Sequence, residues 1–479
     1  MTPAPPRDLR EPGAVLLVSC YELGHRPLGV AAPLAFLRRA GFDPAVIDLA
    51  VERLDRSTVQ RAGLIAISVP MHTALRLGVE AARRMRALAP SAQLCFHGLY
   101  ASLNADYLLR EICDAVIGGE IEEALTAWAE HLSGSRPGPV SGVRLRDREA
   151  PPVLARLDFG TPEETAIPSP QPYARLLRDG EFVLAGAVEA SRGCLHLCRH
   201  CPIPPVYGGR FFVVPKETVL AEIRGQAAAG AGHITFADPD FLNGPGHSLA
   251  IVRAMHRESP ALTFDFTAKI EHVLEHRALL PEFAACGCAF AISAVESLSD
   301  HVLARLRKGH TRRDVHEALE ILRGAGIPLR PSWLPFTPWS AVEDLVEIIE
   351  FVEAGRLIEQ VDPVQYTIRL LIPPGSLLLE EPALVPHLEP LEEASFSYPW
   401  THPDPRMDRL QITLSREVER ATRAGEDAPA VFERVRRIVF SAAGIEAEAH
   451  AAGRAAGAPA AVSGIAGRPA PRLTEPWFC

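Results

Sequence analysis

The segment EASRGCLHLCRHCP, residues 189–202, places three cysteines close together on a short stretch of chain. Cys194, Cys198 and Cys201 have the spacing C-x3-C-x2-C, and thiolates this close on one loop can converge on a single metal centre. The preceding run LAGAVEAS, residues 184–191, is apolar and typical of a buried strand. The segment therefore predicts a metal site that directly follows a strand.

Three thiolates leave such a site one ligand short. A structural zinc ion or a closed iron–sulfur cluster is held by four ligands, whereas an open coordination position is how a metal site admits substrate. Zinc remains an alternative, because His196 or His200 could supply the fourth ligand. Zinc sites, however, usually recur as two separated C-x2-C halves. The pattern thus favours an open three-cysteine site.

Bulk composition indicates an ordinary globular chain. Its 479 residues are 47% hydrophobic and 23% charged, which suits two or three domains. The formal net charge of −10 argues against a general nucleic-acid surface. No apolar run is long enough for a membrane span, and the start MTPAPPRDLREPG lacks a signal peptide, so we expect a cytoplasmic protein without a membrane partner. Nine unevenly scattered cysteines do not form a disulfide framework.

The first third of the chain alternates short apolar runs with helical patterns. The runs lie at residues 14–20, 44–49, 64–69, 92–97 and 114–119. Continuous apolar strands separated by helices indicate a parallel sheet covered on both faces, with ligands beyond the carboxyl ends of the strands. We therefore expect an α/β domain over residues 1–135, of flavodoxin-like (Rossmann-type) class. Its candidate binding loops are residues 21–29, 70–73, 98–104 and 118–122.

Clusters of Pro, Gly and Ser predict a linker over residues 136–180. A second series of apolar runs alternating with helical patterns follows. Strands are expected at residues 184–191, 233–238, 262–267, 289–294, 327–334 and 363–370, with helices between them. Six such units favour a partial (β/α)6 barrel over residues 181–380, whose active residues lie at the carboxyl ends of the strands. A small helical region is expected over residues 381–455. A flexible, Ala/Gly/Pro-rich tail over residues 456–479 then ends in Cys479.

The three-cysteine motif after the first strand of a βα series resembles that of the radical S-adenosylmethionine (SAM) superfamily, over residues 181–375. The resemblance implies a [4Fe–4S] cluster held by Cys194, Cys198 and Cys201, with SAM chelating the fourth iron. One-electron reduction of that cluster would cleave SAM to methionine and a 5′-deoxyadenosyl radical. The radical would take hydrogen from a substrate carbon. An electron donor such as flavodoxin or ferredoxin is implied as a partner.

The resemblance also assigns a set of SAM-binding positions at the strand ends. Before the third cysteine, where the family usually has an aromatic residue near the adenine, this chain has a histidine. Asp-Pro-Asp after the second strand provides a carboxylate for the SAM amino group, although it is also good turn chemistry. The implied cofactor-binding residues are His200, Asp238, Asp240, Ser293, Glu296, Lys308 and Ser332.

A flavodoxin-like domain before a radical SAM barrel resembles the cobalamin-binding class of the superfamily. Gly118-Gly119-Glu120, after DAV, matches the closing strand of that module. The Asp-x-His-x-x-Gly motif, whose histidine replaces the cofactor's own base, is absent, since His25-Arg-Pro-Leu-Gly29 does not fit it. Many relatives also lack that motif. Cobalamin binding is therefore expected alongside a simpler alternative, in which the domain covers the barrel or binds substrate.

The ending Leu473-Thr-Glu-Pro-Trp-Phe-Cys479 resembles that of radical SAM proteins with a CUAEP or CCAEP tail, where U is selenocysteine. In that family the chain continues past the position of Cys479. We therefore hypothesise that an in-frame UGA codon was read as a stop; a UAA or UAG codon there would contradict this. The full tail would carry a vicinal Cys–Sec or Cys–Cys pair able to pass electrons or bind a soft element.

The leading hypothesis is an enzyme that cleaves SAM to start radical chemistry on an unknown small molecule or peptide. If cobalamin binds, methyl transfer to an unactivated carbon is expected. One alternative is a sulfur- or selenium-handling radical enzyme that uses the thiol of Cys479. Another is an iron–sulfur redox sensor or binding protein without SAM turnover.

Overall fold

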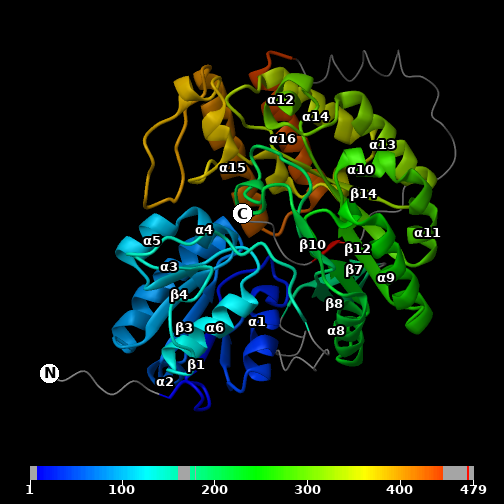
Figure 1. Cartoon of the computed structure of the whole chain (residues 1–479). Helices are drawn as coiled ribbons and strands as arrows, with labels where there is room; N and C mark the ends of the chain where they lie inside the picture. Colours follow the sequence, from blue (N-terminus) through cyan, green and yellow to red (C-terminus); the bar gives the residue numbers. More distant parts are fainter. Residues whose placement is uncertain (1–7, 160–172, 179, 446–471, 474–479) are drawn as a thin grey trace.

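The computed structural model describes residues 8–159, 173–178, 180–445 and 472–473. It contains two parallel sheets that lie side by side, the first drawn in blue and cyan and the second mainly in green (Figure 1). The C-terminal helices α15 (Pro405–Arg423) and α16 (Ala428–Ala442), in orange, lie on the side of the second sheet. The α/β fold class predicted from the sequence is confirmed.

The first sheet has six strands in the order β2-β1-β3-β4-β5-β6. Its five parallel strands are β1 (Val15–Ser19), β2 (Ala45–Asp48), β3 (Leu64–Ser68), β4 (Gln93–His97) and β5 (Ala115–Ile117). The short β6 (Val143–Arg144) pairs antiparallel with β5 and falls within the range predicted as linker. Strand order reverses between β1 and β3, and such a switch point is where open α/β sheets bind ligands.

Two separate hydrophobic cores cover the faces of this sheet. Leu16 and Val18 of β1 pack on the face that is covered by α3 (His72–Leu88) and α5 (Ala105–Glu111). Leu17 points to the opposite face, covered by α1 (Leu28–Arg39) and α6 (Glu122–Leu132). Because successive side chains point to opposite faces, the apolar runs in the sequence are buried on both sides.

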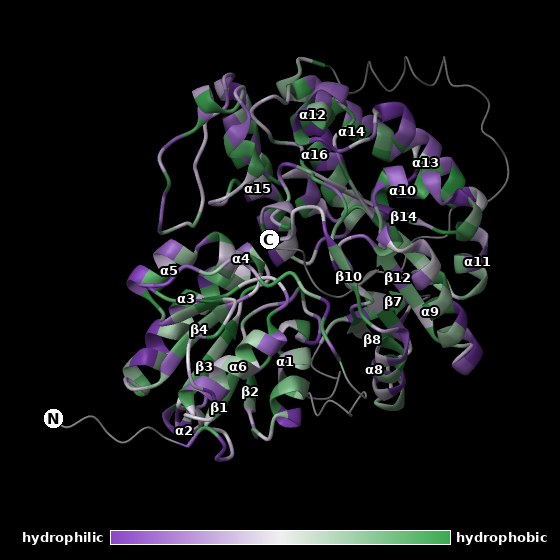
Figure 2. Cartoon of the chain, viewed as in Figure 1, coloured by the Kyte–Doolittle hydropathy of each residue, from purple (hydrophilic) through white to green (hydrophobic). Residues whose placement is uncertain are grey.

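The second sheet has the order β14-β13-β12-β11-β8-β7-β15. Its five parallel strands are β8 (Glu181–Val188), β11 (His233–Phe236), β12 (Thr263–Thr267), β13 (Cys288–Glu296) and β14 (Leu329–Trp333). They curl around a core that they share with the surrounding helices. On the outer surface these helices are hydrophilic, as the purple turns of α13 (Arg312–Gly324) show (Figure 2). The remaining helices at this sheet include α8 (Lys216–Ala228), α9 (Pro245–Glu258), α10 (Ile270–Glu275), α11 (Leu280–Ala285), α12 (Asp300–Leu306) and α14 (Val342–Ala354).

The predicted strand at residues 363–370 was wrong. A 3-10 turn (Pro363–Tyr366) occupies its first half, and Arg369 makes only an isolated bridge to Phe336. The amide oxygen of Gln365 accepts a hydrogen bond from the backbone N–H of Trp333 at 2.9 Å. A side chain thus satisfies an edge group of β14 that a sixth strand would otherwise have paired.

Two antiparallel strands complete the other edge of the second sheet. β7 (Arg175–Arg178), also within the predicted linker range, pairs with β8, and β15 (Arg472–Leu473) pairs with β7. β15 therefore runs in the same direction as β8, toward the carboxyl edge of the sheet. The predicted tail residue Cys479 lies outside the described residues. Within the described part of the chain, no helix combines the length and apolar character that a membrane crossing needs.

A buried glutamine on α8 supports the central strand β8. The Gln226 side chain accepts from Ala187 N and donates to Ala187 O, both at 2.9 Å. Gln226→Met would leave both backbone groups without a partner, so we expect a loss of about 2–4 kcal/mol in the free energy of unfolding. Urea titrations would measure this loss. Arg416→Met, which places the same side chain at an exposed position of α15, is the control and should cost under about 0.5 kcal/mol.

Candidate active site

The three cysteines lie on a loop that begins with a short hairpin. β9 (Ser191–Gly193) pairs antiparallel with β10 (Phe211–Val213), and Cys194 N donates to Arg210 O at 3.0 Å. Gly193 has φ +74°, and a Cβ there would lie 2.4 Å from Arg210 O. Only glycine fits this close approach. The hairpin therefore fixes the position where the cysteine loop leaves the barrel.

Cys194 and Cys198 are buried and Cys201 is half-buried, and none forms a disulfide. Burial, with the nearby charges of Cys198 and Cys194, raises the pKa of Cys201 to about 12. Burial likewise raises the pKa of Cys194. Because metals bind thiolates, a bound cation would offset the cost of ionising Cys194 and Cys201 in this buried setting. This environment fits a metal centre.

The structure does not gather the three sulfurs into a compact group. Sulfurs on one zinc ion lie about 3.8 Å apart, given a Zn–S bond of about 2.3 Å. Among the described residues, the groups of three ligand atoms within 4.8 Å of one another are His196–Asp240–His272 and His272–Glu275–His276, and neither contains a cysteine. At least one pair of the cysteine sulfurs therefore lies farther apart than two sulfurs bound to one zinc ion.

Three of the predicted cofactor-binding residues meet beside the cysteine loop. Glu296 Oε1 lies 3.2 Å from both Lys308 Nζ and His200 Nε2. Burial alone would raise the pKa of Glu296, but the charge of Lys308 and the contact with His200 lower it to about 2. Glu296 also has φ +67°, a strained conformation at the end of β13. The structure thus presents an ionised carboxylate next to the loop.

The two aspartates after β11 have different surroundings. Asp238 is buried and accepts hydrogen bonds from Ala190 N at 2.9 Å and from the Ser191 hydroxyl at 2.6 Å. Burial raises the pKa of Asp238 to about 7. Both of its oxygens therefore support the turn between β8 and β9.

Asp240 instead faces two histidines. Its Oδ2 lies 2.8 Å from His272 Nδ1 and 3.6 Å from His196 Nε2, and these contacts keep its pKa low despite burial. His272, on α10, was missed by the sequence analysis, because a lone histidine in a helix gives no signal of its own. Of the two aspartates, Asp240 has the more polar, cofactor-like surroundings.

The two predicted serines lie on neighbouring strands. Ser293 of β13 is buried, and its hydroxyl has no hydrogen-bond partner among the described residues. Ser332 of β14 is half-buried and lies opposite Ala294 of β13. An unpartnered buried hydroxyl is costly, so Ser293 fits a position that a ligand would satisfy.

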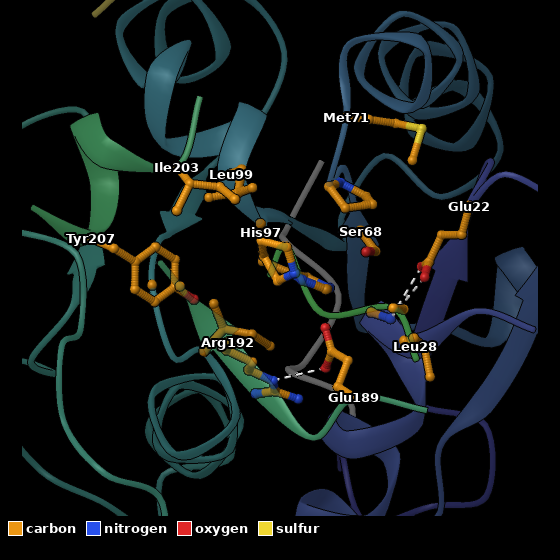
Figure 3. Close-up of a pocket in the computed structure, with 18 of the residues that line it drawn as sticks. Glu22, Leu28, Ser68, Met71, His97, Leu99, Glu189, Arg192, Ile203 and Tyr207 are labelled. Atoms are coloured by element: carbon orange, nitrogen blue, oxygen red, sulfur yellow. Dashed lines mark hydrogen bonds and ion pairs between the residues drawn. The ribbon is translucent and has the colours of Figure 1, made fainter. Parts of the chain in front are cut away.

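A cavity of about 280 Å³ lies between the first sheet and the cysteine loop (Figure 3). All four predicted binding loops of the first domain reach it, contributing among others Glu22, Gly29, Met71, Leu99 and Gly119. The segments that follow strands of the second sheet contribute Glu189, Arg192, Ile203, Tyr207 and Pro239. The cavity therefore opens onto the carboxyl ends of both sheets, where parallel α/β folds bind ligands.

A buried ionic network joins the two halves of the cavity. Arg192 binds Glu122 at 2.6 Å, Glu189 at 2.9 Å and Glu120 at 3.3 Å, while the Tyr207 hydroxyl donates to Glu120 at 2.9 Å. Burial would lower the pKa of Arg192, but the three carboxylates raise it well above its usual value. This network was missed, because its members are distant in sequence. It fixes the turn after β5 against the cysteine loop.

Two features of the first-domain wall suit a large polar ligand. A Cβ at Gly29 would lie 2.1 Å from Ser68 Oγ, so this glycine lets the loop after β1 approach β3. The buried His97 lines the cavity, and its Nε2 has no hydrogen-bond partner among the described residues. Burial lowers the pKa of His97 to about 4, so the ring is neutral. These polar groups fit an amide-rich cofactor such as cobalamin.

Comparison with known proteins agrees with the fold and the cysteine loop. The Radical SAM superfamily model matches residues 188–352, which run from the end of β8 into α14. The fold, the three-cysteine loop and this match together define the class of this region, which is similar to the Radical SAM superfamily, as the sequence predicted. A [4Fe–4S] cluster and SAM are the cofactors of that class.

Among curated proteins, the hopanoid C-3 methylase of Methylococcus capsulatus is 25% identical over 325 residues, 65% of this chain and 61% of that protein. The tRNA-2-methylthio-N(6)-dimethylallyladenosine synthase of Chlorobium limicola is 30% identical over 177 residues, 35% of this chain and 38% of that protein. The chain thus spans less than two thirds of the curated relatives it matches.

Two solved structures of cobalamin-dependent enzymes share the fold. The radical SAM methyltransferase TsrM of Kitasatospora setae, with cobalamin and a [4Fe–4S] cluster bound, has a TM-score of 0.56 at 18% identity, over 72% of this chain and 70% of that one. OxsB, with aqua-cobalamin and SAM bound, has a TM-score of 0.66 at 16% identity, over 86% of this chain and 67% of that one. Both likenesses extend over more of the chain than the radical SAM match alone.

The carboxyl group of Glu22 gives the cavity a measurable pH dependence. Burial raises its pKa to about 8, so the folded state holds a proton that the unfolded chain releases near pH 4.5. Its contribution is therefore favourable at low pH and is lost as the pH rises toward 8. Between pH 6 and pH 8 the cofactor-free protein should lose about 2 kcal/mol of unfolding free energy through this group.

Glu22→Gln keeps an oxygen that can accept the Gly29 N–H but cannot titrate. Its unfolding free energy should lack this component of the pH dependence. Urea titrations at pH 6, 7 and 8 would measure the difference. Equal slopes for the variant and the wild-type chain would show that Glu22 ionises normally.

Proposed function

We propose that the protein is a cobalamin-dependent radical SAM methyltransferase, which transfers a methyl group to a carbon of a small molecule or peptide. The observation that carries the proposal is the cavity between the cysteine loop and the strand ends of the first domain. A cofactor placed there would contact both domains. The names of the similar proteins agree: hopanoid C-3 methylase, TsrM and OxsB are methylating or cobalamin-dependent enzymes by name.

In this proposal each wall of the site has a separate task. Cys194, Cys198 and Cys201 would hold a [4Fe–4S] cluster, and the first-domain loops with the unpartnered His97 would hold cobalamin. When bound, the cluster supplies the electron that cleaves SAM, and cobalamin carries the methyl group to be transferred. The Arg192 network holds these two walls in register.

The residues at the strand ends of the barrel would position SAM. Asp240 remains ionised and would accept hydrogen bonds from an ammonium group. The Ser293 hydroxyl, unpartnered within the described chain, would hydrogen-bond the ligand. Glu296 is held by Lys308 and His200, so its free oxygen can accept from a ribose hydroxyl. Asp238 supports the turn that carries the cysteine loop, and Ser332 lies at the outer strand of the same pocket.

The test is anaerobic reconstitution with iron, sulfide and hydroxocobalamin, followed by assay with SAM and dithionite. We expect about four irons and one corrin per chain, and formation of 5′-deoxyadenosine or S-adenosylhomocysteine. Cys201→Ala should abolish the cluster and SAM turnover, because two thiolates do not retain it. Cys286→Ala, away from the loop, is the matched control and should retain four irons. A cluster without any SAM turnover would instead support an iron–sulfur redox sensor.

Corrin binding is tested separately from the cluster. Gly29→Val would push a side chain into Ser68, because even a Cβ at this position would lie 2.1 Å from Ser68 Oγ. The variant should bind at least tenfold less corrin, with the iron content unchanged. Corrin content is read from the visible spectrum after gel filtration. Unchanged corrin, or none in the wild-type chain, would favour the alternative in which this domain only covers the barrel or binds substrate.

A second candidate function, sulfur or selenium handling through the thiol of Cys479, has one observation in its favour. The predicted resemblance to CUAEP/CCAEP-tail proteins places the reactive pair at the chain end. β15 runs parallel to β8, so Leu473 is directed toward the edge that carries the cysteine loop.

This candidate predicts that the tail thiol takes part in turnover. Cys479→Ser should slow substrate turnover at least tenfold, with the iron content and uncoupled SAM cleavage unchanged. Cys113→Ser, a buried cysteine of the first domain, is the control for a general loss of thiols. Equal turnover by Cys479→Ser and the wild-type chain would rule out a role for the tail in the chain as given.

A further inference from the structure

A buried asparagine contacts the first cysteine of the loop from the barrel side. Asn243 ends a 3-10 turn (Phe241–Asn243) that follows Asp240 after β11. Its Oδ1 accepts a hydrogen bond from Leu195 N at 3.3 Å and lies 3.9 Å from Cys194 Sγ. Within the described chain, this is the one side-chain hydrogen bond that a cysteine of the loop makes to another side chain.

The amide nitrogen of the same side chain has no acceptor. Asn243 is 6% exposed, and its Nδ2 makes no hydrogen bond among the described residues. The N–H of Leu195 fixes the oxygen, so the two N–H groups of the amide remain as donors. A buried donor without an acceptor typically costs about 1–3 kcal/mol, so this donor needs an explanation beyond packing.

The 3-10 turn holds this amide in place. Asp240 Oδ1 accepts from Leu242 N at 3.0 Å, and Asp240 O accepts from Asn243 N at 3.1 Å. Phe241 and Leu242 are buried in the core of the second sheet. The backbone of Asn243 cannot shift without breaking these contacts, so its side chain is preorganised beside Cys194.

Iron binding would change what Cys194 requires of this neighbour. A free thiol can donate its proton to Asn243 Oδ1, but a thiolate that binds a metal can only accept. The nitrogen and oxygen of one amide lie about 2.3 Å apart, so Nδ2 lies within about 6 Å of Cys194 Sγ. The unpartnered donor therefore lies close to the sulfur that metal binding turns into an acceptor.

We propose that Asn243 Nδ2 donates a hydrogen bond to a sulfur atom on the iron that Cys194 would hold, and that this bond raises the reduction potential of the cluster. The inference rests on the cluster of the proposed function and not on its cobalamin. In the reduction, one electron from the reductant changes the cluster from the 2+ to the 1+ state, and no bond breaks. A hydrogen bond to sulfur stabilises the more negative, reduced state, so it shifts the potential upward.

The test measures the potential directly, without SAM. Reconstituted chains are titrated anaerobically with a europium(II) chelate and redox mediators, and the EPR signal of the reduced cluster gives the ratio of reduced to oxidised protein. Asn243→Leu has nearly the same shape but no donor, so at the wild-type midpoint potential this ratio should fall about tenfold. That change equals a shift of about 59 mV for one electron. Asn243→Asp keeps an oxygen for Leu195 N, loses the donor and adds a negative charge, so its ratio should fall at least as far.

The control and the iron content separate this effect from general damage. Gln93→Glu makes the same amide-to-carboxylate change at the amino end of β4, and its ratio should stay within twofold of wild type. Ratios within twofold of wild type in both Asn243 variants, with about four irons retained, would overturn the proposal. A fall in one variant alone would assign the effect to the added charge or to the lost contact with Leu195, and would also overturn it.

A measurement on the unsubstituted chain covers the case in which the variants lose the cluster. The chain has two asparagines, and the Asn104 amide already donates to Tyr100 O at 2.9 Å. With ¹⁵N in the asparagine side chains, pulsed EPR of the reduced cluster should show coupling to one nitrogen, and Asn104→Gln should keep that coupling. No coupling in a wild-type chain with about four irons would overturn the hydrogen bond. A wild-type chain that binds no cluster would instead contradict the proposed function.

Discussion

The buried contact between Arg192 and three carboxylates is the interaction on which the site depends. Arg192 lies on β9, immediately before the cysteine loop, and Glu120 and Glu122 lie after β5 of the other sheet. Removing Arg192 would leave the buried Glu120 and Glu122 without their cation, and breaking a buried ion pair in this way typically costs about 3–5 kcal/mol. The network therefore ties the cysteine loop to the first domain at the wall of the cavity.

Arg192 also lies between two parts of the site that differ in their polar groups. The cavity lies on one side of Arg192. Its wall includes several glycines and the neutral ring of His97. On the other side, the barrel strands present Glu296 and Asp240, whose carboxylates burial would protonate if Lys308, His200 and His272 did not lie against them. Polar groups that are costly to bury have been kept at the carboxyl edge of both sheets, which is what a cofactor-binding edge requires. Elsewhere the barrel core is filled mainly by apolar side chains, with the buried His233–Asp265 pair as an exception.

Much of the fold followed from local patterns. Ten apolar runs became strands within a few residues of the predicted bounds, because a parallel strand buried on both faces has to be continuously apolar. The strand predicted at residues 363–370 did not form, for a reason that an apolar pattern does not contain. Its apolar residues pack beside β14, but Gln365 satisfies the edge of that strand with a side chain. The periodicity of apolar residues indicates which residues are buried. It does not indicate which group hydrogen-bonds to the edge strand of a sheet.

The class of chemistry could be predicted from the spacing of Cys194, Cys198 and Cys201, because that spacing is a property of one short loop. The sequence also located the four first-domain loops that line the cavity, since parallel strands end at a common edge. The three-dimensional contacts were needed to show that Asp238 supports a turn while Asp240 contacts His272, and that Arg192 joins the two domains. These contacts join residues far apart along the chain, and their energies depend on burial and partner distance, which the order of residues does not contain.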